Sequence, residues 1–365
     1  MSTSENAPQE EHRFPCESCG AEMRFSPQTG GLLCDHCGNR EAAPATQQVI
    51  HELDFQKAIA QALPELEHEE NRVASCPNCG AHITFDQSSH ADECPFCATP
   101  VVVDTGLHRQ IKPKGILPFQ IEESIAHDSM NAWLGRLWFA PNGLKKYARK
   151  GRKMQGVYVP YWTFDADTNS RYRGQRGTYY QTTVSRIENG KRVQRTVTKI
   201  RWRAVSGRVG RAFDDILILA SSALPVRYTT ALEPWDLSAI TPYQADFLAG
   251  FQAEGYSLEL QDGFVQAREI MDRQILRDIR FDIGGDRQSV EHVETSIRDV
   301  TFKHILLPVW LAAYKYQGKS YRFVVNGQTG RVEGERPYSA WKIAAAVIAA
   351  TLLAATVGYF YALEG

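Results

Sequence analysis

Cysteine is absent from most of this chain, because all eight cysteines lie before residue 98. The first eleven residues are polar and contain no apolar run, so we expect no secretory signal peptide. Both features argue against a secreted protein stapled by disulfides. The length of 365 residues exceeds what one ordinary domain needs, so we expect several domains.

Short enzyme motifs are also missing. There is no G-x-S-x-G and no H-E-x-x-H, and the nearest approach to a P-loop, Gly318-Lys319-Ser320, has Ala313 where the first glycine is needed. The scattered histidines, such as His127 and His292, are interpreted as ordinary surface or core residues. We therefore predict a protein that is not an enzyme, with no small-molecule substrate evident.

Positive charge is scarce in the first part of the chain. Residues 1–110 carry 6 Lys/Arg against 17 Asp/Glu, whereas residues 111–340 carry 34 against 24. The net charge of −1 therefore conceals an acidic N-terminal part and a basic middle part.

The eight cysteines form two copies of one unit, in which two C-x2-C pairs are separated by fourteen residues. The sets are Cys16, Cys19, Cys34 and Cys37, then Cys76, Cys79, Cys94 and Cys97. A C-x2-C turn can direct both sulfurs at one ion, and the glycine that follows (Gly20 or Gly80) tolerates a positive φ. Four sulfurs with no open position suit a structural zinc ion. We predict two zinc ribbons, at 13–40 and 73–100, each with one Zn²⁺ that supplies most of its stability.

Alternatives remain for these cysteines. The same ligands could form redox dithiols or hold rubredoxin-like iron, and the pairs could close across the two ribbons instead of within each. Between Cys76 and Cys97 there is no Lys or Arg, and bound zinc with four thiolates adds two negative charges. DNA would repel so acidic a ribbon, so we interpret the pair as protein-binding or architectural.

The rest of the chain predicts a linker and helix at 41–72 and a strand-rich α+β body at 112–340. Apolar spacing indicates helices at 51–72, which Pro64 would kink or break into two pieces, and also at 120–137 and 262–280. Hairpins are expected at Asn189-Gly190 and within 321–332. A bulge or a sheet edge is expected at Pro160 and Pro308.

Residues 343–362 are uncharged, and as a helix these twenty residues would span about 30 Å, the thickness of a bilayer core. Trp341 and Tyr359 are typical interface anchors. Because Arg336 and Lys342 precede the span and thiolates need a reducing compartment, we expect a single-pass, tail-anchored protein of the inner membrane with its body in the cytoplasm.

A basic run lies in the middle of the body. Residues 171–211 contain twelve Lys/Arg and one acid, Glu188. The candidate binding residues are Arg186, Arg192, Arg195, Lys199, Arg201 and Arg203. They could form a solvated face balanced by the acidic N-terminal part, or bind anionic lipid, nucleic acid or an acidic protein.

With these residues in view, the chain resembles bacterial double-zinc-ribbon proteins with a C-terminal membrane anchor. Such proteins are often labelled primosomal protein N′ (replication factor Y)-like or TFIIB-type zinc ribbon. The resemblance is carried by the two cysteine sets, by residues 159–165 (VPYWTFD) and 307–310 (LPVW), and by 325–330 (VNGQTG). The helicase label does not transfer, because the P-loop is missing. Some similar proteins look like membrane adaptors for PspA-like or SPFH-type scaffolds in envelope stress.

Together these patterns favour a tail-anchored, zinc-binding adaptor that docks a protein partner on the cytoplasmic face of the membrane and contacts lipid through residues 343–362. The alternative is a membrane-tethered nucleic-acid-binding protein that uses the basic 171–211 hairpin.

Overall fold

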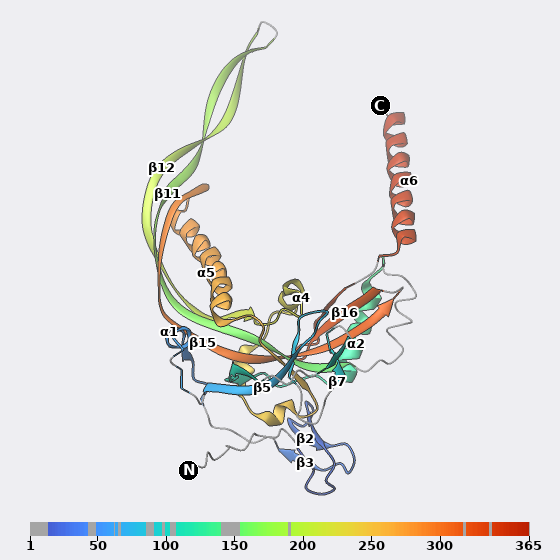
Figure 1. Ribbon diagram of the computed structural model, residues 1–365. Coiled ribbons are helices and arrows are strands. Elements are labelled where there is room, and N and C mark those ends of the chain that lie inside the picture. The colour runs from blue at the N-terminus through green and yellow to red at the C-terminus, as the bar shows by residue number, and fades with distance from the viewer. Residues whose placement is uncertain are drawn as a thin grey trace.

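The fold is strand-rich with a few helices, in a computed structural model of the full chain (Figure 1). The structure describes residues 14–42, 49–61, 63–64, 67–84, 91–96, 99–102, 107–139, 154–188, 191–316, 319–335 and 338–364.

Three very long strands form the centre of the molecule. They are β11 (Gln155–Glu188), β12 (Lys191–Leu219) and β15 (Arg287–Tyr316). β11 pairs antiparallel with both of the others. Glu188 lies opposite Lys191, so β11 and β12 form the hairpin expected here, while Asn189 and Gly190 themselves lie outside the described residues. The distal part of β11 and β12 rises from the body as a twisted two-stranded ribbon (Figure 1).

Shorter strands extend this sheet and form two small ones. In the large sheet the others are β4 (Leu53–Asp54), β5 (His68–Ser75), β6 (His82–Thr84), β9 (Leu107–Ile111), β10 (Gly115–Ile116), β13 (Thr241–Pro242), β14 (Gln252–Gly255), β16 (Lys319–Asn326) and β17 (Val332–Gly334). The small sheets contain β1 (Met23–Ser26), β2 (Gly31–Cys34) and β3 (Arg40–Ala42), and β7 (Ala91–Glu93) and β8 (Pro100–Val102).

Pro160 lies inside β11 and Pro308 lies inside β15. The bulge expected at each proline is absent, because the register between β11 and β15 is regular there and shifts only near Asp165 and Arg173 of β11. Each proline carbonyl accepts a bond on the outer side of its strand, from Ala220 N–H and Gly327 N–H respectively. The missing proline N–H therefore also faces outward, where one neighbouring strand ends and the next begins. A change of neighbour accommodates the missing donor within two central strands.

The helices are few. They are α1 (Phe55–Ile59), α2 (Glu123–Arg136), α4 (Val226–Ala231), α5 (Leu260–Ile283) and α6 (Ala340–Glu364), with 3₁₀ turns η2 (Leu237–Ala239) and η3 (Ala245–Leu248). α2 and α5 confirm two predicted helices within a few residues. The helix predicted over 51–72 is wrong: among the described residues of this range only 55–59 are α-helical, and from His68 the chain is β5, which pairs with β9. Sheet pairing prevails there over the apolar spacing.

α5 packs against the concave side of the three long strands (Figure 1). Its inward side chains recur at helical spacing and are buried: Leu260, Ala267, Met271, Ile275, Ile279 and Ile283. Gly263 lets the helix approach closely, because a Cβ there would come within 2.9 Å of the Trp162 ring. Beyond the C-terminal end of this helix the ribbon has no such cover in the described residues.

α6 extends away from the body, and its C-terminal end points to the same side as the ribbon (Figure 1). Its residues 340–360 are long and apolar enough to cross a membrane, and none of its most apolar stretch is buried. Among the described residues, it meets the body where Ser339 N–H donates to Phe139 O and Lys342 Nζ donates to Trp138 O.

Candidate metal centres

The first four cysteines come together in one small module built on β1, β2 and β3. The Sγ atoms of Cys16, Cys19, Cys34 and Cys37 all lie within 4.8 Å of one another. Both pairs make the same turn: Gly20 N–H donates to Cys16 O at 2.8 Å, and Gly38 N–H donates to Cys34 O at 2.9 Å. Both glycines have φ above +70°, as the turn requires. This cluster closes within one module, as the sequence spacing favours.

The sulfur separations fit a tetrahedral ion. Sγ of Cys16 lies 3.5 Å from that of Cys37, and Sγ of Cys19 lies 3.5 Å from that of Cys34. Four sulfurs about 2.3 Å from a central zinc would be about 3.8 Å apart, whereas a disulfide bond is about 2.05 Å long. The cluster therefore has the size of a four-thiolate metal cage.

Electrostatics in this cluster favour a cation. Although burial opposes ionisation, backbone N–H groups of Ser18 and Cys19 hydrogen-bond to the sulfur and lower the pKa of Cys16 to about 6. At Cys37 the neighbouring sulfurs of Cys19 and Cys16 outweigh a hydrogen bond from Asn39 and raise the pKa to about 12. Four thiols this close ionise together only when a positive ion lies between them.

The second set repeats the arrangement as far as the structure describes it. Sγ atoms of Cys76, Cys79 and Cys94 lie within 4.8 Å of one another, and Cys97 lies outside the described residues. Gly80 N–H donates to Cys76 O at 2.9 Å, which is the same turn as at Gly20. Sγ of Cys79 lies 3.6 Å from that of Cys94. Three ligands of a second cage are thus in place.

Both modules are packed into the body. Phe25 of β1 meets Phe247 edge-on at 5.1 Å, and its N–H donates to Ala249 O at 2.9 Å. In the second module, β6 pairs with β14, which places Ile83 opposite Glu254. The two modules therefore contact neighbouring parts of one segment, 245–255. The first cysteine of each C-x2-C pair is buried in a core that is shared with the body. Packing against the body therefore stabilises both modules.

The outer turns of the first module remain open to solvent. Residues 17–20 and 35–38 are exposed, although Cys16 and Cys34, which directly precede these turns, are buried. β2 and β3 lie at the end of the molecule opposite the free end of α6 (Figure 1). The module therefore presents its turns away from α6.

The candidate basic residues all lie on the distal ribbon. By the β11–β12 register, Arg186, Arg195, Lys199, Arg201 and Arg203 belong to one face, whereas Arg192 pairs with Ile187 and belongs to the other. The structure thus brings together five of the six residues named from the sequence.

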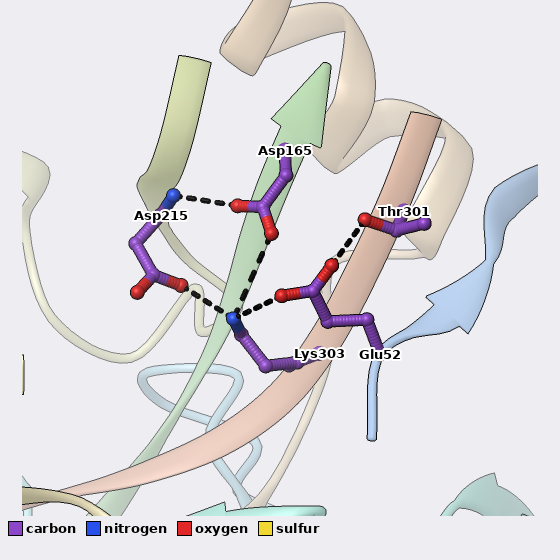
Figure 2. Close-up of polar contacts among 5 residues, drawn as sticks. All are labelled: Glu52, Asp165, Asp215, Thr301 and Lys303. Atoms are coloured by element: carbon purple, nitrogen blue, oxygen red, sulfur yellow. Dashed lines mark hydrogen bonds and ion pairs between the residues drawn. The ribbon is translucent and has the colours of Figure 1, made fainter. Parts of the chain in front are cut away.

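A partly buried ion cluster was not predicted from the sequence (Figure 2). Lys303 Nζ on β15 lies 2.9 Å from Glu52 Oε1, 2.9 Å from Asp215 Oδ1 and 3.7 Å from Asp165 Oδ2. Asp215 N–H donates to Asp165 at 2.6 Å, and Thr301 Oγ1 donates to Glu52 at 2.5 Å. The five groups come from positions up to 251 residues apart, so no local motif could have indicated them.

The charges of this cluster are strongly perturbed. Burial, together with the adjacent Glu52, raises the pKa of Asp165 to about 7. Although burial opposes the ammonium, hydrogen bonds to Asp215 and Glu52 raise the pKa of Lys303 above its usual value. Asp165, Asp214 and Asp215 are close enough to hold a metal, but the Lys303 ammonium already stands among these carboxylates. We interpret the cluster as a clamp that ties the segment before α1 to the sheet.

The comparisons with known proteins give one informative match. The chain is 26% identical over 333 residues to the uncharacterized protein YdjG of Bacillus subtilis (strain 168), an alignment that covers 91% of this chain and 92% of that protein. No family model matches the chain. No solved structure matches it either.

Proposed function

We propose that this protein is a tail-anchored, zinc-binding adaptor on the cytoplasmic face of a membrane, where the cysteine modules dock a protein partner. The observation that carries the proposal is that two different surfaces lie at opposite ends of the molecule. The exposed turns of the first cysteine module lie at the end opposite the free end of an apolar helix that no other part of the described chain buries.

Zinc is the proposed ion in both clusters. The sulfur separations suit zinc–thiolate bonds, and a cage of four protein sulfurs leaves no position for a substrate, which fits a structural role. Cys16, Cys19, Cys34 and Cys37 would hold the first ion, and Cys76, Cys79, Cys94 and Cys97 the second. Such an ion fixes the exposed turns in one shape, which is what a docking surface needs.

The membrane side of the proposal rests on α6. Its exposed side chains include Leu353, Phe360 and Trp341, each more than 60% exposed. An apolar helix with this much surface is stable only in lipid or against another protein. The excess of Lys and Arg before the span, together with free thiols that need a reducing compartment, supports a cytoplasmic body.

The partner is expected to be a protein. The exposed turns carry Glu17 and Asp35, and a four-thiolate zinc site adds negative charge, which disfavours nucleic acid at this end. The resemblance stated above implies a scaffold of envelope-stress machinery as the class of partner.

Crosslinking in intact cells tests the docking role. Full-length protein should crosslink to a defined partner, and Cys37→Ser, which removes one exposed ligand, should abolish that product. Lys57→Met, at an exposed position of α1 outside both cysteine modules, should leave the product unchanged. The same crosslinked product from Cys37→Ser would show that the cysteine modules are not the docking site.

A further inference from the structure

Beyond the last pair that β11 makes with β15, Gly177 with Arg287, the described parts of β11 and β12 pair only with each other. We call residues 178–188 and 191–201 the distal arm. An isolated two-stranded ribbon is marginally stable in water. We therefore expect the distal arm to gain stability from contact with another surface.

Most cations of the distal arm belong to one face. Side chains of paired residues share a face, and the faces alternate along each strand. One face, the basic face, carries Arg186, Arg195, Lys199, Arg201 and, at the base, Arg203. The other, the polar face, carries uncharged pairs: Gln181 with Thr198, Thr183 with Thr196, and Ser185 with Gln194. By register, Arg192 near the tip belongs to the polar face, as do Arg171, Arg173 and Arg208, which lie closer to the body than the distal arm.

The basic face is available to a partner. Its five cations are all exposed, and the Arg201 guanidinium lies over the Tyr180 ring at 5.1 Å, which keeps it in place without neutralising it. The face continues the surface on which α5 packs, but α5 ends at Ile283, before the distal arm begins. The strands β2 and β3 of the acidic N-terminal part lie at the end of the molecule opposite the distal arm (Figure 1).

The distal arm and α6 rise on the same side of the body (Figure 1). We propose that the basic face binds the anionic lipid headgroups of the membrane that holds α6. This inference rests on the proposed membrane anchoring. Arg and Lys near an anionic leaflet gain attraction that adds up over several residues, and it falls off within a Debye length.

The arm lies along the headgroups and does not enter the hydrocarbon, because charged side chains are costly there. This placement requires the body to incline about the junction near Ser339, where α6 meets the body. The placement favours lipid over nucleic acid, since a tethered arm meets the leaflet at a high local concentration.

Hydrogen exchange of the full chain in lipid nanodiscs tests the proposal. We compare discs of phosphatidylcholine alone with discs in which about one third of the lipid is phosphatidylglycerol. Amides of the distal arm should exchange about tenfold more slowly in the anionic discs, and the difference should vanish in about 0.5 M NaCl. Equal exchange in both kinds of disc would overturn the proposal.

Matched variants assign the effect to one face. The triple variant Arg195→Gln, Lys199→Gln and Arg201→Gln should lose the slowing. The variant Arg171→Gln, Arg173→Gln and Arg208→Gln removes the same charge from exposed positions that belong, by register, to the opposite face, and it should keep the slowing. Loss in both variants alike would overturn the assignment to the basic face.

Two further results separate the explanations. If duplex DNA added to phosphatidylcholine discs slows the same amides as strongly as anionic lipid does, the arm is a nucleic-acid surface and the proposal is wrong. Retention of the chain by the discs reports on α6 alone. If the chain stays in the discs but the amides of the distal arm exchange at the same rate whatever the lipid charge, the arm proposal is wrong and the proposed membrane anchor still stands.

Discussion

Arg211 of β12 forms a bidentate ion pair with Asp278 of α5, with Nε 2.6 Å from Oδ2 and Nη2 2.7 Å from Oδ1. One turn further along α5, Tyr172 of β11 donates a hydrogen bond to Asp282. At the end of the helix, Arg176 donates to the carbonyl of Ile283. These contacts fix the base of the ribbon on α5, and the ribbon continues beyond them.

Asp278→Asn should therefore loosen the base of the ribbon. We expect the free energy of unfolding to fall by about 1 kcal/mol, since the pair is well aligned but partly exposed. The hydrogen bond from Arg211 lowers the pKa of Asp278, so this contribution is present above the unfolded pKa of about 4 and is lost as the pH falls through the folded value. Thermal unfolding in detergent at neutral and acidic pH measures it, with exposed Glu269→Gln as the control. A difference that persists unchanged at acidic pH would contradict the ion-pair account.

Lys303→Met should destabilise the protein by about 1–3 kcal/mol, because it leaves the partly buried carboxylates of Glu52, Asp165 and Asp215 facing one another without a cation. The loss should be larger at pH 8 than at pH 5, since the carboxylates can take up protons at the lower pH. Lys57→Met, at an exposed position of α1, is the matched control. Chemical unfolding at both pH values measures the effect, and equal losses at the two would argue against repulsion as its cause.

His304 should make the protein sensitive to mild acid. It is buried beside Trp162 and Tyr256, and burial lowers its pKa to about 4, against a hydrogen bond to Ile111 O that acts in the other direction. The unfolded chain takes up the proton more readily, so stability should fall as the pH drops below 6.5 towards 4, by about 1–2 kcal/mol at pH 5. His304→Gln removes the titrating ring and should flatten this part of the profile. An unchanged slope in the variant would exclude His304 as the source.

The sequence predicts the parts of this molecule whose signals are local. Cysteine spacing with a following glycine predicts the turns at Gly20 and Gly80, apolar spacing predicts α2 and α5, and the Asn-Gly signal predicts the antiparallel pairing of β11 with β12. The failures have a tertiary cause. Residues 68–75 join a sheet through β9, which no pattern within 51–72 reveals. The Lys303 cluster gathers residues from distant segments, so its members look like ordinary surface charges in the sequence.

Cys37→Ser should remove one metal ion and leave the other. Cys37 is an exposed ligand of the first cluster only, so the second cluster keeps its three described cysteines in place. Atomic emission of the purified protein should fall from two zinc ions per chain to about one. Ser18→Ala should retain both, and a chelator should lower the unfolding temperature of the wild-type protein more than that of Cys37→Ser. Loss of both ions would indicate that the cysteine pairs close across the two modules.

The most direct test of a zinc-bearing, membrane-tethered protein is the zinc content of the full-length chain in membranes washed with alkaline carbonate. We predict that the chain stays in the washed membranes with two zinc ions per molecule. A chain that the wash releases, or one that remains in the membrane without metal, would contradict this account.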